Sequence, residues 1–461
     1  MKLSPEQSYA LQLFQEGENV FLTGPGGTGK TMLIKLFMEN ALLRNKKIQI
    51  CAMTGCASLL LNCKARTIHS WSGLQLAKGP NDKIIFRILN NKKAVQSWKS
   101  IDILVIDEVS MMSCKIFEIL DMLGRKIRNQ FSKPFGGVQV IFSGDFYQLP
   151  PVGDINEVDT QQFCFESKRW GEVFSLDNHV ELTTMFRQTD PVYQDILLSI
   201  RNGNINLEQI NILETYIDRV YDPEQNHGCV PTKIYPTLAK VNYVNRMMFD
   251  KLPGIHTEYE CIKKTNCTEY LDNCTKRSFT KEDMDKSVHM TERDKNTELE
   301  KLIANSPFQQ ILSLKIGASV MCIVNLDLDN GICNGSIGVI EEFSQKEIPL
   351  PIVRFSNGIK REIAIYYWQS DEYPAVAVGQ FPLRLAWAIT IHKIQGATLP
   401  MAEIDIGTSI FEYGQTYVAL SRIQSLDGLY LTGFSVKNIH VHKKVKEFYS
   451  NIPKVEYEFE V

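Results

Sequence analysis

A glycine-rich loop near the start of the chain constrains the fold more than any other feature of the sequence. Residues 19–31 read NVFLTGPGGTGKT, an apolar run followed by the pattern G-x-x-x-x-G-K-T. The glycines let successive backbone N–H groups point at phosphate oxygens, Lys30 adds a positive charge, and the Thr31 hydroxyl suits Mg²⁺. A flexible glycine turn is the alternative, but the preceding apolar run favours a P-loop that binds a nucleoside triphosphate. The predicted loop residues are Gly24, Gly26, Gly27, Thr28, Gly29, Lys30 and Thr31.

The composition is that of an ordered protein with several domains. The chain has 461 residues, 44% of them hydrophobic, which is enough for two to four buried cores. A net charge of −3 argues against a basic coat protein for nucleic acid, although 50 Lys and Arg residues leave room for a local basic channel. The 11 cysteines include no C-x-x-C pair, so we expect neither a disulfide scaffold nor a zinc site.

The ends and apolar runs of the sequence bear on its location. The chain begins almost directly on motif residues, which leaves no room for a cleavable signal, and no apolar run has the length of a membrane span. We therefore expect a soluble intracellular protein without membrane contact. Nucleus, cytoplasm and a viral replication site all remain open.

Apolar runs alternating with a helical pattern predict a parallel α/β sheet. Residues 47–52, 101–106 and 138–142 are apolar without alternation, as in strands buried on both faces. Residues 110–130 repeat apolar positions every three or four residues, which indicates an amphipathic helix. In such a sheet the functional site lies at the carboxyl ends of the strands.

The second half of the chain contains three kinds of sequence pattern. Strand-like runs at 385–391, 402–406 and 429–432, with a helical pattern at 413–423, favour a second α/β core. Residues 256–305 are polar and poor in large apolar side chains, and we interpret them as a mobile insertion or a few loose helices. Residues 312–380 carry short β-rich runs separated by Asn-Gly turn signals, which predict a small barrel.

Polar residues follow two of the predicted strands. Asp107 and Glu108 come directly after residues 101–106, where one carboxylate can hold Mg²⁺ and the other can orient the attacking water. An exposed acidic pair that caps the next helix is the alternative. Gln148 follows the next strand in the segment GDFYQLPP, where its amide can contact the γ-phosphate, unless the segment is only a proline-stiffened turn.

Two arginines are candidates to reach the same phosphate from the second core. Arg187 lies in the segment MFRQ and Arg422 in the segment YVALSR. Arginine fingers are typically worth ~10³–10⁵ in rate, whereas a surface salt bridge is the commoner fate of an arginine.

Three further segments combine hydroxyls, cations and rings. Hydroxyls and cations suit the phosphates of a single strand, and aromatic rings suit its bases. A Trp or His inside an α/β domain is more often a core residue. The candidate strand contacts are Thr54, His69, Trp71, Thr390, His392 and Lys393.

Taken together, these motifs resemble the Pif-type DNA helicases, a branch of superfamily 1B related to RecD. The resemblance covers residues 3–201, 233–245 and 316–432, and its most specific part is the stretch 121–145 with KPFGG at its centre. The resemblance implies that Gln7 contacts adenine, and it supports the catalytic assignments of Lys30, Asp107, Glu108, Gln148, Arg187 and Arg422.

The same resemblance implies an architecture. Two RecA-like cores would carry a small wedge insertion in the first and an SH3-like β-barrel in the second. The expected boundaries are 1–178 for the first core, with its insertion at 66–100; 179–255 and 381–461 for the second core; and 256–380 for the second insertion, with its polar stretch at 256–305 and its barrel at about 312–380.

The function implied by the resemblance is ATP-dependent unwinding of DNA. The enzyme would use ATP and Mg²⁺, move 5′-to-3′ on single-stranded DNA as a monomer, and open duplex or forked DNA in replication, repair or recombination. An RNA or RNA–DNA hybrid helicase is the nearest alternative. A P-loop phosphotransferase or GTPase switch and a passive single-strand binding module are two more distant ones.

Overall fold

The fold is taken from a computed structural model. It describes residues 3–54, 57–58, 61, 65–74, 77, 79–154, 156–222, 230–271, 277–279, 290–327, 330–332, 334–370, 373–407 and 409–453. The chain forms two compact units, one of residues 1–219 with 391–461 and one of residues 220–390. Each is described by itself.

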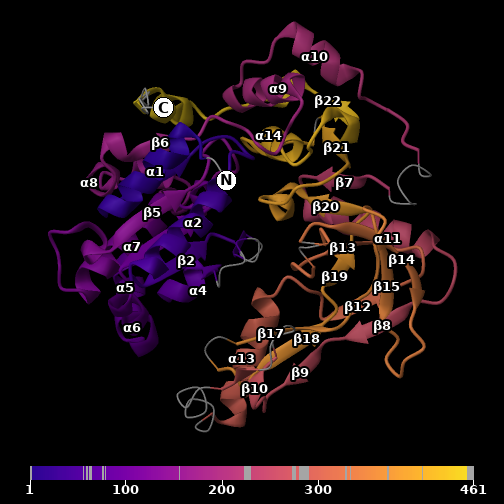
Figure 1. The fold of residues 1–461 in the computed structure, drawn as a ribbon, viewed down its shortest axis with the longest axis horizontal. Helices are drawn as coiled ribbons and strands as arrows, with labels where there is room; N and C mark the ends of the chain where they lie inside the picture. The colour runs from indigo at the N-terminus through magenta and orange to yellow at the C-terminus, as the bar shows by residue number, and fades with distance from the viewer. Residues whose placement is uncertain are drawn as a thin grey trace. The chain divides into compact units, whose positions relative to one another are not determined.

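A six-stranded parallel sheet is the centre of the first unit (Figure 1). The sheet order is β3-β2-β4-β5-β1-β6, and every neighbouring pair is parallel. The predicted strands and the parallel α/β class are confirmed. The strands are β1 (Val20–Thr23), β2 (Ile48–Ala52), β3 (Arg66–Thr67), β4 (Ile103–Asp107), β5 (Gln139–Ser143) and β6 (His179–Glu181).

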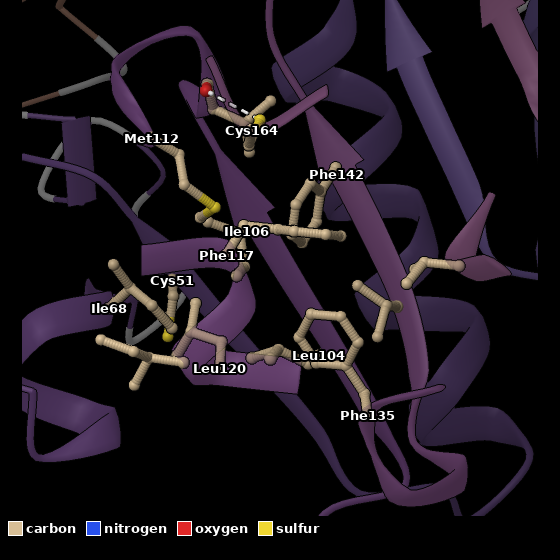
Figure 2. Packing of buried hydrophobic residues seen from close by; sticks show 14 of the residues in the cluster. Cys51, Ile68, Leu104, Ile106, Met112, Phe117, Leu120, Phe135, Phe142 and Cys164 are labelled. Atoms are coloured by element: carbon tan, nitrogen blue, oxygen red, sulfur yellow. Dashed lines mark hydrogen bonds between the residues drawn. The ribbon is translucent and has the colours of Figure 1, made fainter. Parts of the chain in front are cut away.

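Helices cover both faces of this sheet. Successive strand residues point to opposite faces, and all residues of β1 and β4 are buried, so both faces must be covered. On one face Leu22 and Val105 pack with residues of α1 (Pro5–Glu16) and α2 (Lys30–Leu43). On the other face Leu104, Ile106 and Phe142 pack against Phe117 of α7 (Cys114–Ile127), as Figure 2 shows. The predicted amphipathic helix is therefore present, beginning four residues later than the pattern at 110–130.

Short helices pack against the α7 side of the sheet. The insertion after β3 consists of α4 (Ile68–Ser72), α5 (Asn81–Leu89) and α6 (Lys92–Ser100), and α8 (Trp170–Val173) follows later in the chain. Trp71 of α4 and Trp98 of α6 lie with ring centroids 4.9 Å apart. The insertion therefore shares the apolar core of the sheet domain.

The segment Lys133–Gly137, at the centre of the resemblance, is fixed by a buried carboxylate. Asp121 accepts a hydrogen bond from the Phe135 N–H at 2.8 Å, and Phe135 is buried although its φ is +49°. A Cβ on Gly136 would lie 2.2 Å from the carbonyl oxygen of Gly124, so only glycine allows this approach of loop to helix. The segment is thus a rigid part of the first unit.

The remaining elements of the first unit come from two distant stretches of chain. The strands β21 and β22 pair in parallel. Val445 of α15 packs in the core of the first sheet. Predicted strands at 402–406 and 429–432 are confirmed. The elements are α9 (Pro191–Asn202), α10 (Leu207–Glu214), the 3₁₀ turn η7 (Ile391–Ile394), β21 (Ala402–Ile406), α14 (Gln415–Leu420), β22 (Leu429–Phe434) and α15 (Lys443–Ser450).

The second unit contains a small α/β part and a β-rich part. In the α/β part, β7 (Thr232–Tyr235) pairs in parallel with β20 (Ala388–Thr390), and α11 (Leu238–Lys251) packs on them. The predicted strand at 385–391 is thereby confined to three residues.

The β-rich part is antiparallel. A five-stranded sheet has the order β16-β15-β14-β13-β19, and an Asn-Gly turn at residues 357–358 joins β15 to β16, as predicted. Whether this sheet is SH3-like stays a prediction. The strands are β12 (Ile311–Leu314), β13 (Ser319–Cys322), β14 (Ile337–Phe343), β15 (Pro351–Phe355), β16 (Lys360–Glu362), β17 (Tyr366–Gln369), β18 (Ala377–Gln380) and β19 (Leu383–Leu385).

Within the described part of residues 256–305, the interpretation as a mobile insertion or a few loose helices holds only for the presence of one helix, and the other elements there are strands. There β8 (Thr257–Glu260) pairs with β12 and β9 (Ile262–Lys264) pairs with β18, so the stretch belongs to the β-rich core. Hydrogen bonds between strands hold it in place, and few large apolar side chains are needed. The stretch also contains β10 (Glu269–Tyr270), β11 (Arg277–Ser278) and α13 (Glu292–Asn305).

Candidate nucleotide site and strand-contact segments

The glycine-rich loop joins β1 to α2, as the sequence predicts. Gly27 and Gly29 have φ values of +86° and +87°, which side chains disfavour. A Cβ on Gly24 would lie 2.3 Å from the carbonyl oxygen of Leu182. Gly24 also has a positive φ, +132°, so glycine is required at all three positions by both conformation and space.

Lys30 lies at the start of α2 with its ammonium group turned back onto the loop. Its Nζ donates to the carbonyl oxygens of Gly24 at 2.6 Å and Pro25 at 2.9 Å. Burial lowers the pKa of Lys30, and the nearby carboxylates of Asp145 and Glu108 act in the opposite direction. The cation is thus held over the loop that would cradle phosphates.

Gln7 and Thr31 flank the loop. Gln7 is 1% exposed, and its Nε2 donates to the Thr28 carbonyl oxygen at 3.2 Å. Its Oε1 accepts from the Ser4 N–H in a capping box that fixes the start of α1. Thr31 is an exposed residue at the start of α2.

Asp107 is the last residue of β4 and Glu108 follows it, and both carboxylates lie close enough to Lys30 to influence its pKa. The Ser143 hydroxyl donates to Asp107 Oδ1 at 2.7 Å, and burial followed by the charge of Glu108 raises the pKa of Asp107 to about 7. Glu108 has left-handed backbone angles, φ 56° and ψ 41°, which are unusual outside glycine and typical of functional sites. Gln395 Nε2 donates to Glu108 Oε2 at 3.0 Å.

Arg187 lies directly against the glycine-rich loop. The Phe186 N–H donates to the Gly27 carbonyl oxygen at 2.8 Å, and a Cβ on Gly27 would lie 2.6 Å from that of Arg187. Arg187 Nη1 donates to the Ser421 carbonyl oxygen at 3.0 Å. Burial and then the charge of Arg422 lower the pKa of Arg187 to about 10, and the guanidinium remains charged.

Arg422 and Gln148 meet at the same place. Arg422 Nη2 donates to Gln148 Oε1 at 3.2 Å, and the two side chains are 2% and 4% exposed. Burial lowers the pKa of Arg422, while the charge of Glu108 opposes the shift. Both arginines predicted from the sequence therefore lie beside the P-loop and its carboxylates.

Several residues of this site were not predicted. Gln188 donates to the carbonyl oxygens of Ser421 and Ile423, and the Tyr417 hydroxyl accepts from the Gly26 N–H at 2.8 Å. Gln188 is the last residue of the quoted segment MFRQ, and Gln395 lies two residues after Lys393, a predicted strand contact. Tyr417 is the first residue of the segment YVALSR, but the sequence gives no indication that it contacts the glycine-rich loop.

A buried ion pair lies behind the loop and was also missed. Arg201 of α9 donates to both Asp145 oxygens, and Tyr449 of α15 bonds to Thr23 at 2.6 Å. Burial is the largest single influence on Arg201 and opposes its charge, but the charge and hydrogen bond of Asp145 act together with Tyr449 and Tyr417 and hold the pKa of Arg201 above its ordinary value.

The predicted strand contacts are more dispersed. Thr54 and His69 are half-buried, and burial lowers the pKa of His69. Thr390 ends β20 in the second unit and is 6% exposed. His392 and Lys393 lie on η7, where Lys393 is exposed and burial lowers the pKa of His392.

Trp71 is the exception among these predictions. Its side chain is 3% exposed and packs against Trp98 in the core, so it does not form a stacking surface in this structure. The reason is physical: an indole ring on a short amphipathic helix gains more from burial than from exposure. The core alternative is favoured.

The site fits a nucleoside triphosphate with a divalent cation. Left-handed glycines line the loop, Lys30 lies over it, Asp107 presents a buried carboxylate, and Thr31 is an exposed residue at the start of α2. Among the described residues, no group of three or more His, Cys, Asp or Glu side chains forms a metal site. No helix in the described part of the chain has the length and apolar character to cross a membrane.

A parallel sheet with a P-loop, two strand-end carboxylates and two facing arginines defines a P-loop NTPase with a RecA-like core. Comparison with known families agrees: the PIF1-like helicase model matches residues 2–211, and the model of the DNA helicase Pif1 2B domain matches residues 299–343. The chain belongs to the PIF1-like helicase family.

Individual relatives match along nearly the whole chain. The ATP-dependent DNA helicase PIF1 of Danio rerio is 33% identical over 457 residues, covering 98% of this chain and 64% of its own length. The crystal structure of Pif1 helicase from Candida albicans matches with a TM-score of 0.76 and 30% identity, covering 98% of this chain and 100% of the other.

A nucleotide-bound relative is also similar. Pif1 helicase from Bacteroides in complex with ADP-AlF3 and ssDNA matches with a TM-score of 0.63 and 27% identity, covering 98% of this chain and 97% of the other. The chain spans slightly less than two thirds of the length of the Danio rerio relative.

Proposed function

We propose that this protein is an ATP-dependent DNA helicase that moves along single-stranded DNA and unwinds duplex or forked DNA. The observation that carries the proposal is the convergence of Lys30, Glu108 and Arg422 on one site, supplied by distant parts of the chain. A nucleotide bound there would contact the side of the site that carries Lys30 and Glu108 and the side that carries Arg422 at the same time. The Bacteroides relative with ADP-AlF3 and ssDNA supports this assignment.

The nucleotide would be held by the loop and by Gln7. Amides of residues 24–31 and the Lys30 ammonium group would bind the phosphates, and Gln7, already buried against the loop, would contact adenine. Thr31 and Asp107 would hold Mg²⁺, which neutralises charge developing on the phosphates.

Hydrolysis requires a positioned water and stabilised charge. Glu108 would orient the water that attacks the γ-phosphorus, so that the bond from phosphorus to the bridging oxygen breaks and ADP and phosphate form. Arg187 and Arg422 would stabilise the charge on the γ-phosphate oxygens, and Gln148 would contact the same phosphate. A buried guanidinium is effective here because little water screens it.

Hydrolysis would be coupled to movement through the contacts that the γ-phosphate makes. Once the phosphate leaves, Gln148, Arg187 and Arg422 lose a shared partner, and the two sides can separate. Reversing such an equilibrium from 1:99 to 99:1 takes about 5.5 kcal/mol, whereas opening one base-pair step takes roughly 1.4 kcal/mol. A step of one nucleotide per ATP is energetically feasible.

The DNA strand would contact Thr54, His69, Thr390, His392 and Lys393, and travel would be 5′-to-3′. We assign residues 1–178 to the first core, with its insertion at 66–100. Residues 179–255 with 381–461 form the second core, and 256–380 form an insertion with an SH3-like barrel. A monomer inside the cell, acting in replication, repair or recombination, completes the proposal.

Strand displacement from tailed duplexes tests the proposal. The protein should displace a strand from a duplex with a 5′ tail in the presence of ATP and Mg²⁺, and Lys30→Ala should not. Equal displacement by both proteins would refute the proposal, and displacement only from a 3′ tail would refute the polarity.

An RNA or RNA–DNA hybrid helicase is the second candidate. The names of the PIF1 relatives favour DNA. ATPase stimulation by DNA and RNA oligomers of the same sequence separates the two, because only contacts near the 2′-hydroxyl distinguish them.

A further inference from the structure

Gln395 links the segment proposed to contact DNA with the carboxylate proposed to orient water. It follows η7, two residues after Lys393, and donates from Nε2 to Glu108 Oε2 at 3.0 Å. These residues lie 287 positions apart in the sequence. One hydrogen bond therefore joins the two functions of the site.

The position of Glu108 makes this bond consequential. The charge of Glu108 acts to raise the pKa of Lys30, Arg187 and Arg422, because its carboxylate lies among the cations of the nucleotide site. An amide donor on one carboxylate oxygen removes a lone pair that would accept from water. Held in this way, Glu108 is less able to orient the attacking water.

The glutamine itself is not fully satisfied. Gln395 is 5% exposed, and its Oε1 is buried without a hydrogen-bond partner in the described part of the chain. A buried amide oxygen without a partner is costly. In the observed position the Nε2 group has a hydrogen-bond partner and the Oε1 atom has none among the described residues. Such an arrangement is expected for a side chain that adopts a second position in which Oε1 is also bonded.

We propose that Gln395 is a positioning residue that restrains Glu108 until DNA binds beside it at His392 and Lys393. DNA contact with η7 draws Gln395 away, Glu108 is released to orient water, and hydrolysis becomes dependent on the strand. The inference rests on the proposed function and assigns to Gln395 the control of ATP hydrolysis by DNA.

The test compares ATP hydrolysis with and without a single-stranded thymidine oligomer in three proteins. Gln395→Met keeps the length of the side chain and removes the amide. The matched control is Gln209→Met, because Gln209 is also buried and also donates to a carboxylate, that of Asp195 at 2.6 Å, outside the nucleotide site.

The restraint predicts a gain of activity, which structural damage would not give. A hydrogen bond to a charged acceptor typically shifts an equilibrium by about tenfold or more. Without DNA, kcat of Gln395→Met should rise by roughly tenfold with little change in KM for ATP. The ratio of stimulated to basal rate should fall by the same factor, and Gln209→Met should keep the wild-type ratio.

A second variant protects the test against a packing defect in the first. Gln395→Leu also removes the amide donor, with a differently shaped apolar side chain, so it should also raise the basal rate. A basal rate that is unchanged or lower in both variants would overturn the inference. If the wild-type protein shows no hydrolysis that depends on Lys30, the proposed function itself fails.

Discussion

Arg422 and Gln148 are joined by a hydrogen bond of 3.2 Å between Nη2 and Oε1, although 274 residues separate them in the sequence. The guanidinium is also anchored on the preceding helix α14, where Nε donates to the Val418 carbonyl oxygen at 3.0 Å. These two hydrogen bonds hold the guanidinium in place before any phosphate binds.

Removing this arginine should abolish most turnover. Arg422→Ala should lower the DNA-stimulated kcat by about 10³ or more, because a finger stabilises charge that develops during hydrolysis. Arg422→Lys keeps the charge but cannot make both hydrogen bonds, so it should recover only a small part. Steady-state phosphate release measures both, and a loss below tenfold in Arg422→Ala would refute the finger assignment.

The sequence predicted the parts of the site that lie at strand ends. Lys30, Asp107 and Gln148 follow three buried parallel strands, and such ends meet at one edge of a sheet. Local pattern was therefore enough for these residues. It was not enough for Tyr417 and Gln395, whose roles depend on contact with segments hundreds of residues away.

Two interpretations differ from the structure, the strand-contact role of Trp71 and the loose insertion at 256–305, and the differences have a common cause. Trp71 and residues 256–305 were interpreted from the side-chain type alone, without knowledge of their neighbours. Trp71 has Trp98 as a partner, and β8 and β9 have partner strands 50 or more residues further along. Tertiary pairing overrides local composition in both cases.

The Tyr417 hydroxyl accepts a hydrogen bond from a backbone N–H of the P-loop, and removing this hydroxyl should strengthen the binding of ATP. The Gly26 N–H that donates to Tyr417 at 2.8 Å belongs to the row that would bind phosphate. In Tyr417→Phe that N–H loses its partner, so the γ-phosphate no longer competes for it. The Kd of a non-hydrolysable ATP analogue should fall about threefold to tenfold, while that of ADP stays within twofold.

Tyr193→Phe is the matched control for this measurement. Tyr193 is fully buried and donates to the Leu420 carbonyl oxygen at 2.8 Å, so it contacts the same helix without touching the loop. Fluorescence titration should show no change in the preference between the two nucleotides. Weaker analogue binding by Tyr417→Phe would mean that the hydroxyl binds phosphate directly.

His179 should make the first unit sensitive to mild acid. It accepts a hydrogen bond from Trp170 Nε1 at 3.0 Å, and burial lowers its pKa. Below the ordinary histidine pKa of about 6.5 the unfolded chain binds a proton that the folded one resists, so stability present at higher pH is lost as pH falls. His179→Gln keeps an acceptor and should reduce the drop in Tm between pH 7.5 and 5.5.

The ion pair between Arg201 and Asp145 should be among the most sensitive in the protein. The side chains are 5% and 0% exposed, and the guanidinium also lies 4.4 Å from the Tyr147 ring centroid. Removing one partner leaves the other charge buried, so Arg201→Met should lower the free energy of unfolding by about 3–5 kcal/mol.

The double variant separates this cost from the net value of the pair. Arg201→Met with Asp145→Leu removes both charges, so it should lose less than the two single changes together. Arg246→Met is the control, because its pair with Asp250 is exposed at 3.8 Å and is worth roughly 0–1 kcal/mol. Urea denaturation measures all four variants, and additive losses would show that the two charges do not depend on each other.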